Sequence, residues 1–169
     1  MISGDARMVR SLSISLAALL LGACAMPLVP GTSTEADVLA FFGKPIDTRQ
    51  IEGGSRQFDY PRGPLGRETW RITLSANGKV QWVEQLLDEA HFTRIKSGMS
   101  KIDVQRELGR HFITTDFANL GEQVWSWRYT DFGSRYMFFN AHFDAQTGLL
   151  KHASRTPEFI NEFRLRGRR

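Results

Sequence analysis

One short motif occurs twice in the chain: Thr34-Glu35-Ala36-Asp37-Val38 is followed, 66 positions later, by Ser100-Lys101-Ile102-Asp103-Val104. In each copy a hydroxyl residue lies three positions before an aspartate. This spacing is typical of a helix N-terminus. There the hydroxyl accepts a hydrogen bond from the backbone amide of the aspartate, and the aspartate carboxylate accepts one from the backbone amide of the hydroxyl residue. Each copy then ends in an apolar residue and a glycine, Phe42-Gly43 and Leu108-Gly109, which indicates the helix end. A helix of about nine residues is unstable alone, so each must pack on another element.

Alternating apolar and polar residues after each helix indicate strands that bury one face. The sequence predicts strands at 56–60, 69–75 and 80–87 in the first copy and at 123–130, 136–143 and 149–154 in the second. Asn77-Gly78 is a hairpin signal, and the joining segment 88–96 is a candidate helix. We therefore expect an α+β fold of two tandem small units, each with one or two short helices packed on a three-stranded antiparallel meander.

The N-terminus has the pattern of a secretion signal. Arg7 and Arg10 precede a mostly apolar run of ten residues, 12–21, which is too short to span a bilayer. The following Leu21-Gly22-Ala23-Cys24 resembles the lipobox of bacterial lipoproteins. We expect cleavage between Ala23 and Cys24 and attachment of a lipid, including palmitate, to Cys24. The alternative is an ordinary secretory signal in which Cys24 merely lies near the cut.

The residue after the cysteine bears on the destination of a lipoprotein. Ala25 is not aspartate, so by analogy with lipoprotein sorting we expect the periplasmic face of the outer membrane. More than one acyl chain gives stable attachment where a single chain does not. Met8 begins an equally good signal, so translation starts either there or at Met1.

Composition limits the classes of function. The chain has 169 residues, of which 41% are apolar and 24% charged, with a net charge of +4 and a pI of about 9.6. This mild basicity suits contact with anionic membrane lipid, whereas a nucleic-acid binder usually has a denser Lys/Arg stripe. The single cysteine excludes an internal disulfide and a cysteine-based zinc site.

A family resemblance enters through the second copy. It has Phe92-Thr93-Arg94-Ile95-Lys96-Ser97-Gly98-Met99-Ser100, then Leu108-Gly109 and Trp125-Ser126-Trp127-Arg128-Tyr129. This resembles the SmpA/OmlA (BamE-like) family of outer-membrane lipoproteins, whose pattern is an isoleucine, a Gly-Met-Thr/Ser turn, a valine, a Leu-Gly pair and a Trp-x-Tyr strand. The chain departs from that pattern because Gly109-Arg110-His111 replaces a usual proline and because there are two copies, the first more diverged.

The resemblance implies a division of the chain and a function. It gives a signal peptide (1–23), an anchor linker (24–30), a diverged first unit (31–87), a second unit (88–155) and a basic C-terminal helix or tail (156–169). The implied function is support of β-barrel outer-membrane protein assembly, or of envelope integrity, through contacts with the barrel-assembly machinery.

The resemblance also implies where a partner would bind. Phe92, Ile95 and Met99 lie around the glycine turn and are the expected partner contacts. A plug between the two units is the alternative role for the same side chains.

The C-terminal segment has its own local signals. Thr156-Pro157 has the pattern of an N-cap and first helical residue, and the last residues carry four arginines that could meet anionic headgroups or an acidic partner. A solvated, frayed tail is the alternative.

We expect no enzyme, no metal and no cofactor other than the lipid. The sequence has no nucleophile elbow, phosphate loop or paired-carboxylate signature. The four histidines show no metal-ligand spacing, and His142 and Asp144, on one face of a strand, are interpreted as ordinary polar positions.

The rival function is a periplasmic inhibitor or ligand-binding lipoprotein with a concave sheet surface like that of β-lactamase inhibitors. The exposure of the four tryptophans discriminates between these two functions. Burial favours a scaffold, and joint exposure on a concave face favours recognition. They are Trp70, Trp82, Trp125 and Trp127.

Overall fold

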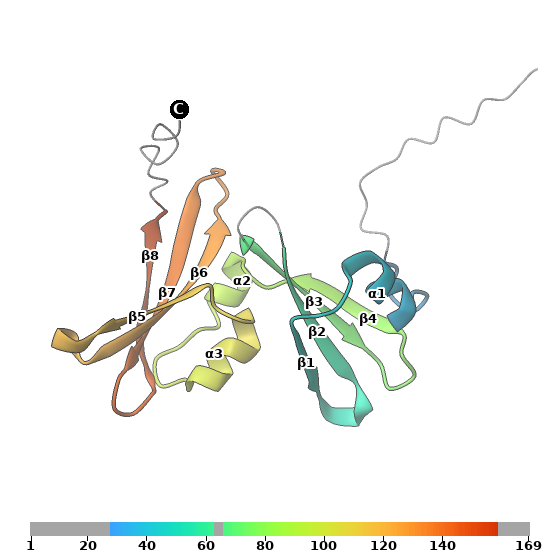
Figure 1. Ribbon diagram of the computed structural model, residues 1–169, viewed down its shortest axis with the longest axis horizontal. Helices are drawn as coiled ribbons and strands as arrows, with labels where there is room; N and C mark the ends of the chain where they lie inside the picture. The colour runs from blue at the N-terminus through green and yellow to red at the C-terminus, as the bar shows by residue number, and fades with distance from the viewer. Residues whose placement is uncertain (1–27, 63–65, 159–169) are drawn as a thin grey trace, which may run out of the picture.

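The computed structural model describes residues 28–62 and 66–158. They form two successive units, each a four-stranded antiparallel sheet with a short helix on one face (Figure 1). The first unit contains α1 (Glu35–Phe42), β1 (Asp47–Gln50), β2 (Arg56–Arg62), β3 (Glu68–Leu74) and β4 (Val80–Gln85). The second contains α2 (Glu89–Phe92), α3 (Lys101–Leu108), β5 (Ile113–Phe117), β6 (Glu122–Thr130), β7 (Tyr136–Asp144) and β8 (Leu150–Pro157). In both sheets the strand order follows the chain.

The α+β architecture of tandem units is confirmed, but each sheet has one more strand than the predicted three-stranded meander. The additional strands are β1 and β5, at the edge of each sheet. β1 contains no apolar residue, and β5 is exposed along its whole length. Neither segment therefore carries the apolar period by which a strand is predicted from sequence.

Both helix N-termini are capped as the repeated motif predicts. The Thr34 amide donates to Asp37 Oδ2 (2.8 Å), and the Ser100 amide donates to Asp103 Oδ2 (3.2 Å). These bonds complete a capping box at each helix. Hydrogen bonds from Thr34 lower the pKa of Asp37. The motif therefore positions two short helices in the same way.

Each unit buries its own core. Val38 of α1 and Val104 of α3 are fully buried against their sheets. The repeat extends to a polar bond, because Tyr60 Oη and Trp127 Nε1 each donate to the carbonyl of the glycine that ends the helix, at 3.1 Å. The acceptors are the carbonyls of Gly43 and Gly109, respectively. The two units are thus versions of one packing plan.

The prediction of a helix that begins at Thr156-Pro157 is wrong, because both residues belong to β8. Pro157 lies opposite Met137 at the end of an edge strand. A proline is tolerated there because its missing amide removes no bond from the sheet interior. Residues 159–169 lie outside the described residues.

The predicted signal peptide and Cys24 also lie outside the described residues. Within 28–62 and 66–158, no helix is long and apolar enough to cross a membrane. Because Cys24 is not among the described residues, the anchor stays a prediction from sequence.

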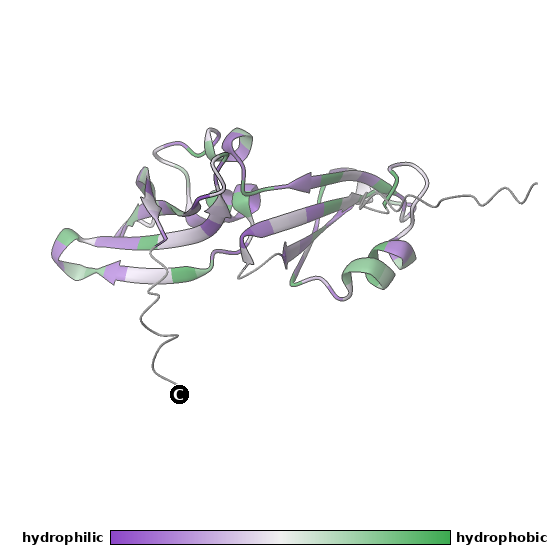
Figure 2. Ribbon diagram, turned by 90° about the horizontal axis from the view of Figure 1, so that it is seen from above, coloured by the Kyte–Doolittle hydropathy of each residue, from purple (hydrophilic) through white to green (hydrophobic). Residues whose placement is uncertain are grey.

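The second unit packs against the face of the first sheet that α1 does not cover. α1 covers one face of the first sheet, and the opposite face meets the end of α3, because Arg49 and Arg71 both donate to the Arg106 carbonyl. In Figure 2 the two units lie side by side along the long axis, and α1 lies toward the end away from the second unit. The colours show that the strands carry both hydrophobic and hydrophilic residues. The polar face of the first sheet is therefore partly covered by the second unit.

Candidate binding cleft between the two units

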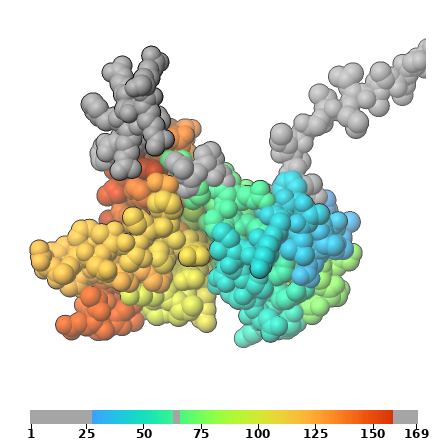
Figure 3. Space-filling view, in the orientation of Figure 1, coloured from blue at the N-terminus to red at the C-terminus, as the bar shows by residue number. Residues whose placement is uncertain are grey.

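A cleft of about 920 Å³ opens where the polar face of the first sheet meets the helices of the second unit. Figure 3 shows the surface hollowed between the yellow atoms of the second unit and the blue-green atoms of the first. One wall consists of β1, β2, β3 and β4, and the other of α2, α3 and the segment between them. The lining residues are Asp47, Arg49, Gln50, Ile51, Glu52, Gln57, Arg71, Glu84, His91, Arg94, Ile102, Gln105, Arg106 and Glu107.

Arg71 forms the floor of this cleft. Its Nε and Nη2 donate to the two carboxylate oxygens of Asp59, each at 2.7 Å, and both residues are buried. The remaining Nη1 donates to the Arg106 carbonyl at 2.5 Å. This carbonyl lies in the last turn of α3, where helix carbonyls lack partners within the helix and favour cations. One guanidinium therefore connects the first sheet to the second unit.

Arg49 lies beside Arg71 on the same wall. Its Nε donates to Gln57 Oε1 at 3.0 Å, and its Nη2 reaches the Arg106 carbonyl at 3.3 Å. Burial, and then the neighbouring Arg71, lower the pKa of Arg49, but an arginine stays charged at neutral pH. The wall thus presents two fixed, parallel cations.

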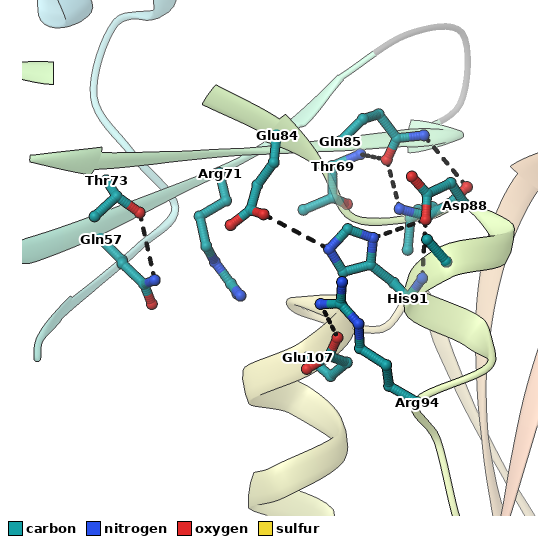
Figure 4. A network of polar contacts seen from close by, with 12 residues as sticks. Gln57, Thr69, Arg71, Thr73, Glu84, Gln85, Asp88, His91, Arg94 and Glu107 are labelled. Atoms are coloured by element: carbon teal, nitrogen blue, oxygen red, sulfur yellow. Dashed lines mark hydrogen bonds and ion pairs between the residues drawn. The ribbon is translucent and has the colours of Figure 1, made fainter. Parts of the chain in front are cut away.

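His91 marks the opposite wall, at the end of α2. Its Nδ1 lies 2.7 Å from Asp88 Oδ1, and its Nε2 lies 3.8 Å from Glu84 Oε2 across the cleft. Figure 4 shows the imidazole between these two carboxylates, with the Arg94 side chain beneath it. Burial alone would raise the pKa of Asp88, but hydrogen bonds from the His91 amide and ring lower it.

The outer part of the cleft is more open. Arg94 Nη1 donates to Glu107 Oε1 at 3.0 Å, as Figure 4 shows. Two exposed isoleucines face solvent on opposite sides, Ile51 after β1 and Ile102 on α3. The cleft therefore combines fixed charges of both signs with apolar side chains at its rim.

The structure places the expected partner contacts inside a core. Phe92 and Ile95 are buried in the second unit, and Met99 packs against them. Phe92 stacks on Phe139 with ring centroids 4.3 Å apart. Their side chains therefore form neither an exposed contact surface nor a plug between the units.

The tryptophans separate into two groups. Trp127 is 1% exposed, and Trp70 and Trp125 are partly buried against the two cores. Trp82 is 69% exposed and lies opposite Thr73, on the polar face of the first sheet that also carries Arg71. The four tryptophans therefore lack the joint exposure expected for recognition, and Trp82 alone among them is exposed enough to contact a partner.

The sequence interpretation missed two groups of residues. The cleft joins residues from both units that no local pattern connects. In addition, His142 approaches Glu122 and His152, with one ligand atom of each within 4.8 Å of the others. The interpretation had treated His142 and Asp144 as ordinary polar positions of one strand face. Asp144 Oδ1 accepts from the amides of the following turn. Cross-strand register is the signal that would have found this group.

The comparisons with known proteins correct the family expectation. No protein-family model matches the chain, and no curated protein sequence matches it. The structure is similar to that of a DUF4309 family protein, YjgB, from Bacillus subtilis, with 17% identity over 79% of this chain and 84% of that chain and a TM-score of 0.30. It is also similar to a candidate beta-lactamase inhibitor protein from Streptococcus mutans, with 12% identity over 73% and 82% and a TM-score of 0.28.

The SmpA/OmlA assignment is therefore wrong, since no family model supports it and the similar structures belong to other groups. At these TM-scores the similarities support no conclusion about function. The residues that suggested the assignment are the turn from Phe92 to Ser100, the Leu108-Gly109 pair and the strand from Trp125 to Tyr129. Each is a local pattern that many folds share.

Proposed function

We propose that this protein is a cell-envelope lipoprotein that binds a partner protein in the cleft between its two units. The observation that carries this proposal is the cleft itself, a large and open space whose arginines are held in place by Asp59 and by the Arg106 carbonyl. A preorganised polar surface loses little side-chain freedom on binding, which favours affinity.

The charges of the cleft favour a protein over other ligands. The lining carries four arginines and also four carboxylates, from Asp47, Glu52, Glu84 and Glu107. A nucleic acid or a polyphosphate would need an excess of positive charge. A mixed surface matches a protein segment that carries both signs, and such matching contributes specificity.

Exposed apolar side chains supply the rest of the contact. Ile51 and Ile102 stand at the rim, and Trp82 lies on the same face of the first sheet. Tryptophan and arginine are the residues that most often carry binding energy at protein interfaces. The proposed role is thus recognition, as in the rival function. Barrel assembly is not carried forward, because it followed from the resemblance alone.

A photo-crosslinking amino acid placed in the cleft tests the proposal. The full chain, with its own N-terminus, is produced in the native bacterium with benzoylphenylalanine at Ile51 or at Ile102. These positions sample opposite walls of the cleft. We expect both to capture the same protein, identified by mass spectrometry. The control position is Thr115, an exposed residue of β5, which should capture nothing above background.

Two results would contradict the proposal. One is the capture of unrelated proteins from the two walls, and the other is equal capture at Thr115. A second variant, Arg94→Glu, reverses one charge at the open part of the cleft and should reduce capture at Ile102. Arg94 is exposed, so this change is expected to leave folding intact.

The lipid anchor is tested separately. Mass spectrometry of the mature N-terminus should find acyl mass on Cys24, and Cys24→Ser should leave an uncleaved precursor. An unchanged mature size and membrane location in Cys24→Ser would exclude the anchor. That result would leave the cleft proposal standing, because capture at Ile51 and Ile102 does not depend on lipid.

A further inference from the structure

The outward face of the second sheet carries a compact group of metal-ligating side chains. Glu122 on β6, His142 on β7 and His152 on β8 each offer a ligand atom, and these atoms lie within 4.8 Å of one another. His142 and His152 are direct cross-strand partners, and their rings stack with centroids 4.2 Å apart. Donors that share a tetrahedral Zn²⁺ at about 2.0–2.2 Å lie roughly 3.5 Å apart. Small ring rotations therefore suffice to bring the three donors onto one ion.

The contacts of His142 suit a ligand. Its Nδ1 lies 3.1 Å from Glu122 Oε2, and its Nε2 lies 2.9 Å from Ser154 Oγ. Metal-bound histidines usually use one ring nitrogen for the ion and the other for an outer hydrogen bond that orients the ring. With Nε2 bonded to Ser154, the Nδ1 lone pair and Oε2 are left to share a cation.

Glu122 is ready to serve as an anionic ligand. Its residue is buried at the start of β6, and Lys151 Nζ donates to its Oε1 at 2.6 Å. Neutral pH lies well above the ordinary pKa of a glutamate, so the carboxylate is charged. Lys151 is thus both a support for the carboxylate and a competing positive charge.

The first unit shows that the fold does not require these residues. Both sheets have a bulge, after Thr73 in β3 and after His142 in β7. The cross-strand pair at this bulge is Thr73 and Trp82 in the first unit and His142 and His152 in the second. Because the same backbone accepts a threonine and a tryptophan, the two histidines are not a consequence of packing.

We infer that Glu122, His142 and His152 form a site for a divalent transition-metal ion, with Zn²⁺ as the ion expected. Two imidazoles and one carboxylate form a donor set that Zn²⁺ uses, with a fourth position left for water or another ligand. His152 is exposed, so that fourth position is open to solvent. The site lies on a different sheet from the cleft and is independent of the proposed partner.

Zinc binding to the full purified chain, carried on a tag without histidine, tests the inference. Calorimetric titration with zinc chloride should give one equivalent per chain. His152→Ala and Glu122→Gln should each weaken binding by about tenfold or more, in line with the loss of a ligand or its direct support. Lys151→Met should strengthen binding, because the competing ammonium is gone. A purely structural role for the cluster would not produce that gain.

The matched control is His91→Gln, which removes the histidine that lies between Asp88 and Glu84. It should leave zinc affinity unchanged. Thermal melts with and without zinc report folding, since a ligand that binds the folded state raises its melting temperature. The inference is overturned if the chain binds no zinc, if His152→Ala binds as well as the parent, or if binding is lost in His91→Gln instead.

Discussion

Arg71 and Asp59 form a buried ion pair with two hydrogen bonds across β2 and β3, and they are only 5% and 3% exposed. Two parallel bonds of this kind fix the guanidinium in orientation as well as in position. The free Nη1 therefore points at the Arg106 carbonyl, and the relative position of the two units depends on this pair.

Removing one member of this pair should be strongly destabilising. In Asp59→Asn the guanidinium of Arg71 stays buried without its charge partner, which costs roughly 3–5 kcal/mol. Urea unfolding measures this loss. The double variant Asp59→Leu/Arg71→Met should lose less than the sum of the two single changes, because neither charge of the pair remains buried. The control Arg106→Ala should stay close to the parent, because Arg71 uses only its backbone carbonyl. A loss in Arg106→Ala equal to that in Asp59→Asn would contradict this account.

The two helix-ending glycines allow a matched comparison. Gly43 and Gly109 have nearly the same backbone, with φ of +77° and +72°. Alanine in this region of backbone conformation costs about 1–3 kcal/mol at either position. At Gly109 a Cβ would also lie 2.9 Å from Thr69 Cγ2, whereas nothing lies within 4 Å at Gly43.

Gly109→Ala should therefore be more destabilising than Gly43→Ala, by an additional 1–3 kcal/mol or so for the forced displacement. Equilibrium unfolding of both variants measures the difference. Equal losses would show that the contact between Gly109 and Thr69 is not tight in solution.

Protonation of His111 should weaken the fold. Its ring stacks on Trp125 at 4.1 Å, and burial, followed by the charge of Arg110, lowers its pKa below the ordinary 6.5. The unfolded chain then binds more protons as the pH falls. The stabilisation that the neutral His111 ring contributes is fully present above about pH 6.5. It is lost as the pH falls through the lower pKa of His111 in the folded state.

His111→Phe keeps an aromatic ring on Trp125 but cannot be protonated. Urea unfolding midpoints between about pH 8 and pH 5 should therefore fall less in this variant than in the parent. All other residues are the same in both proteins, so the difference between the two curves isolates His111. Parallel curves would exclude a role for this ring.

A second buried charge group joins the units near the end of β8. Glu158 accepts from Arg67 Nη2 at 2.8 Å, and its other oxygen lies 2.9 Å from Arg128 Nε. Glu158→Ala should cost about 3–5 kcal/mol, because it removes the carboxylate shared by two arginines whose side chains are only 4% and 18% exposed.

The appropriate control is Glu89→Ala, which removes an exposed ion pair with Arg155 that should contribute no more than about 1 kcal/mol. Chemical denaturation compares the two variants. If Glu158→Ala is as mild as Glu89→Ala, the group near β8 does not hold the units together.

The helices and most strands could be predicted because their signals are local. Thr34 and Asp37 lie within one helical turn, and Trp125, Trp127 and Tyr129 alternate within one strand. β1 and β5 could not be predicted, since edge strands with polar side chains carry no period. The family assignment failed for a related reason: the glycine turn, the Leu-Gly pair and the Trp-x-Tyr strand are local patterns that unrelated folds share.

The candidate sites were the least predictable part. Arg71 and Arg106, or Glu122 and His152, lie far apart in the chain and come together only through strand register and the packing of the units. Polar residues at such positions look like ordinary surface residues in the sequence. The spacing of the four histidines in the sequence therefore predicts no metal site.

Local sequence patterns are enough to specify the repeated helix cap and the alternation of the central strands, and hence the tandem α+β plan, because these depend on residues a few positions apart. The contact between the first sheet and α3, and the convergence of Glu122, His142 and His152, arise only in the folded chain. Those arrangements depend on contacts between segments that lie far apart in the chain, so no single stretch of sequence indicates them.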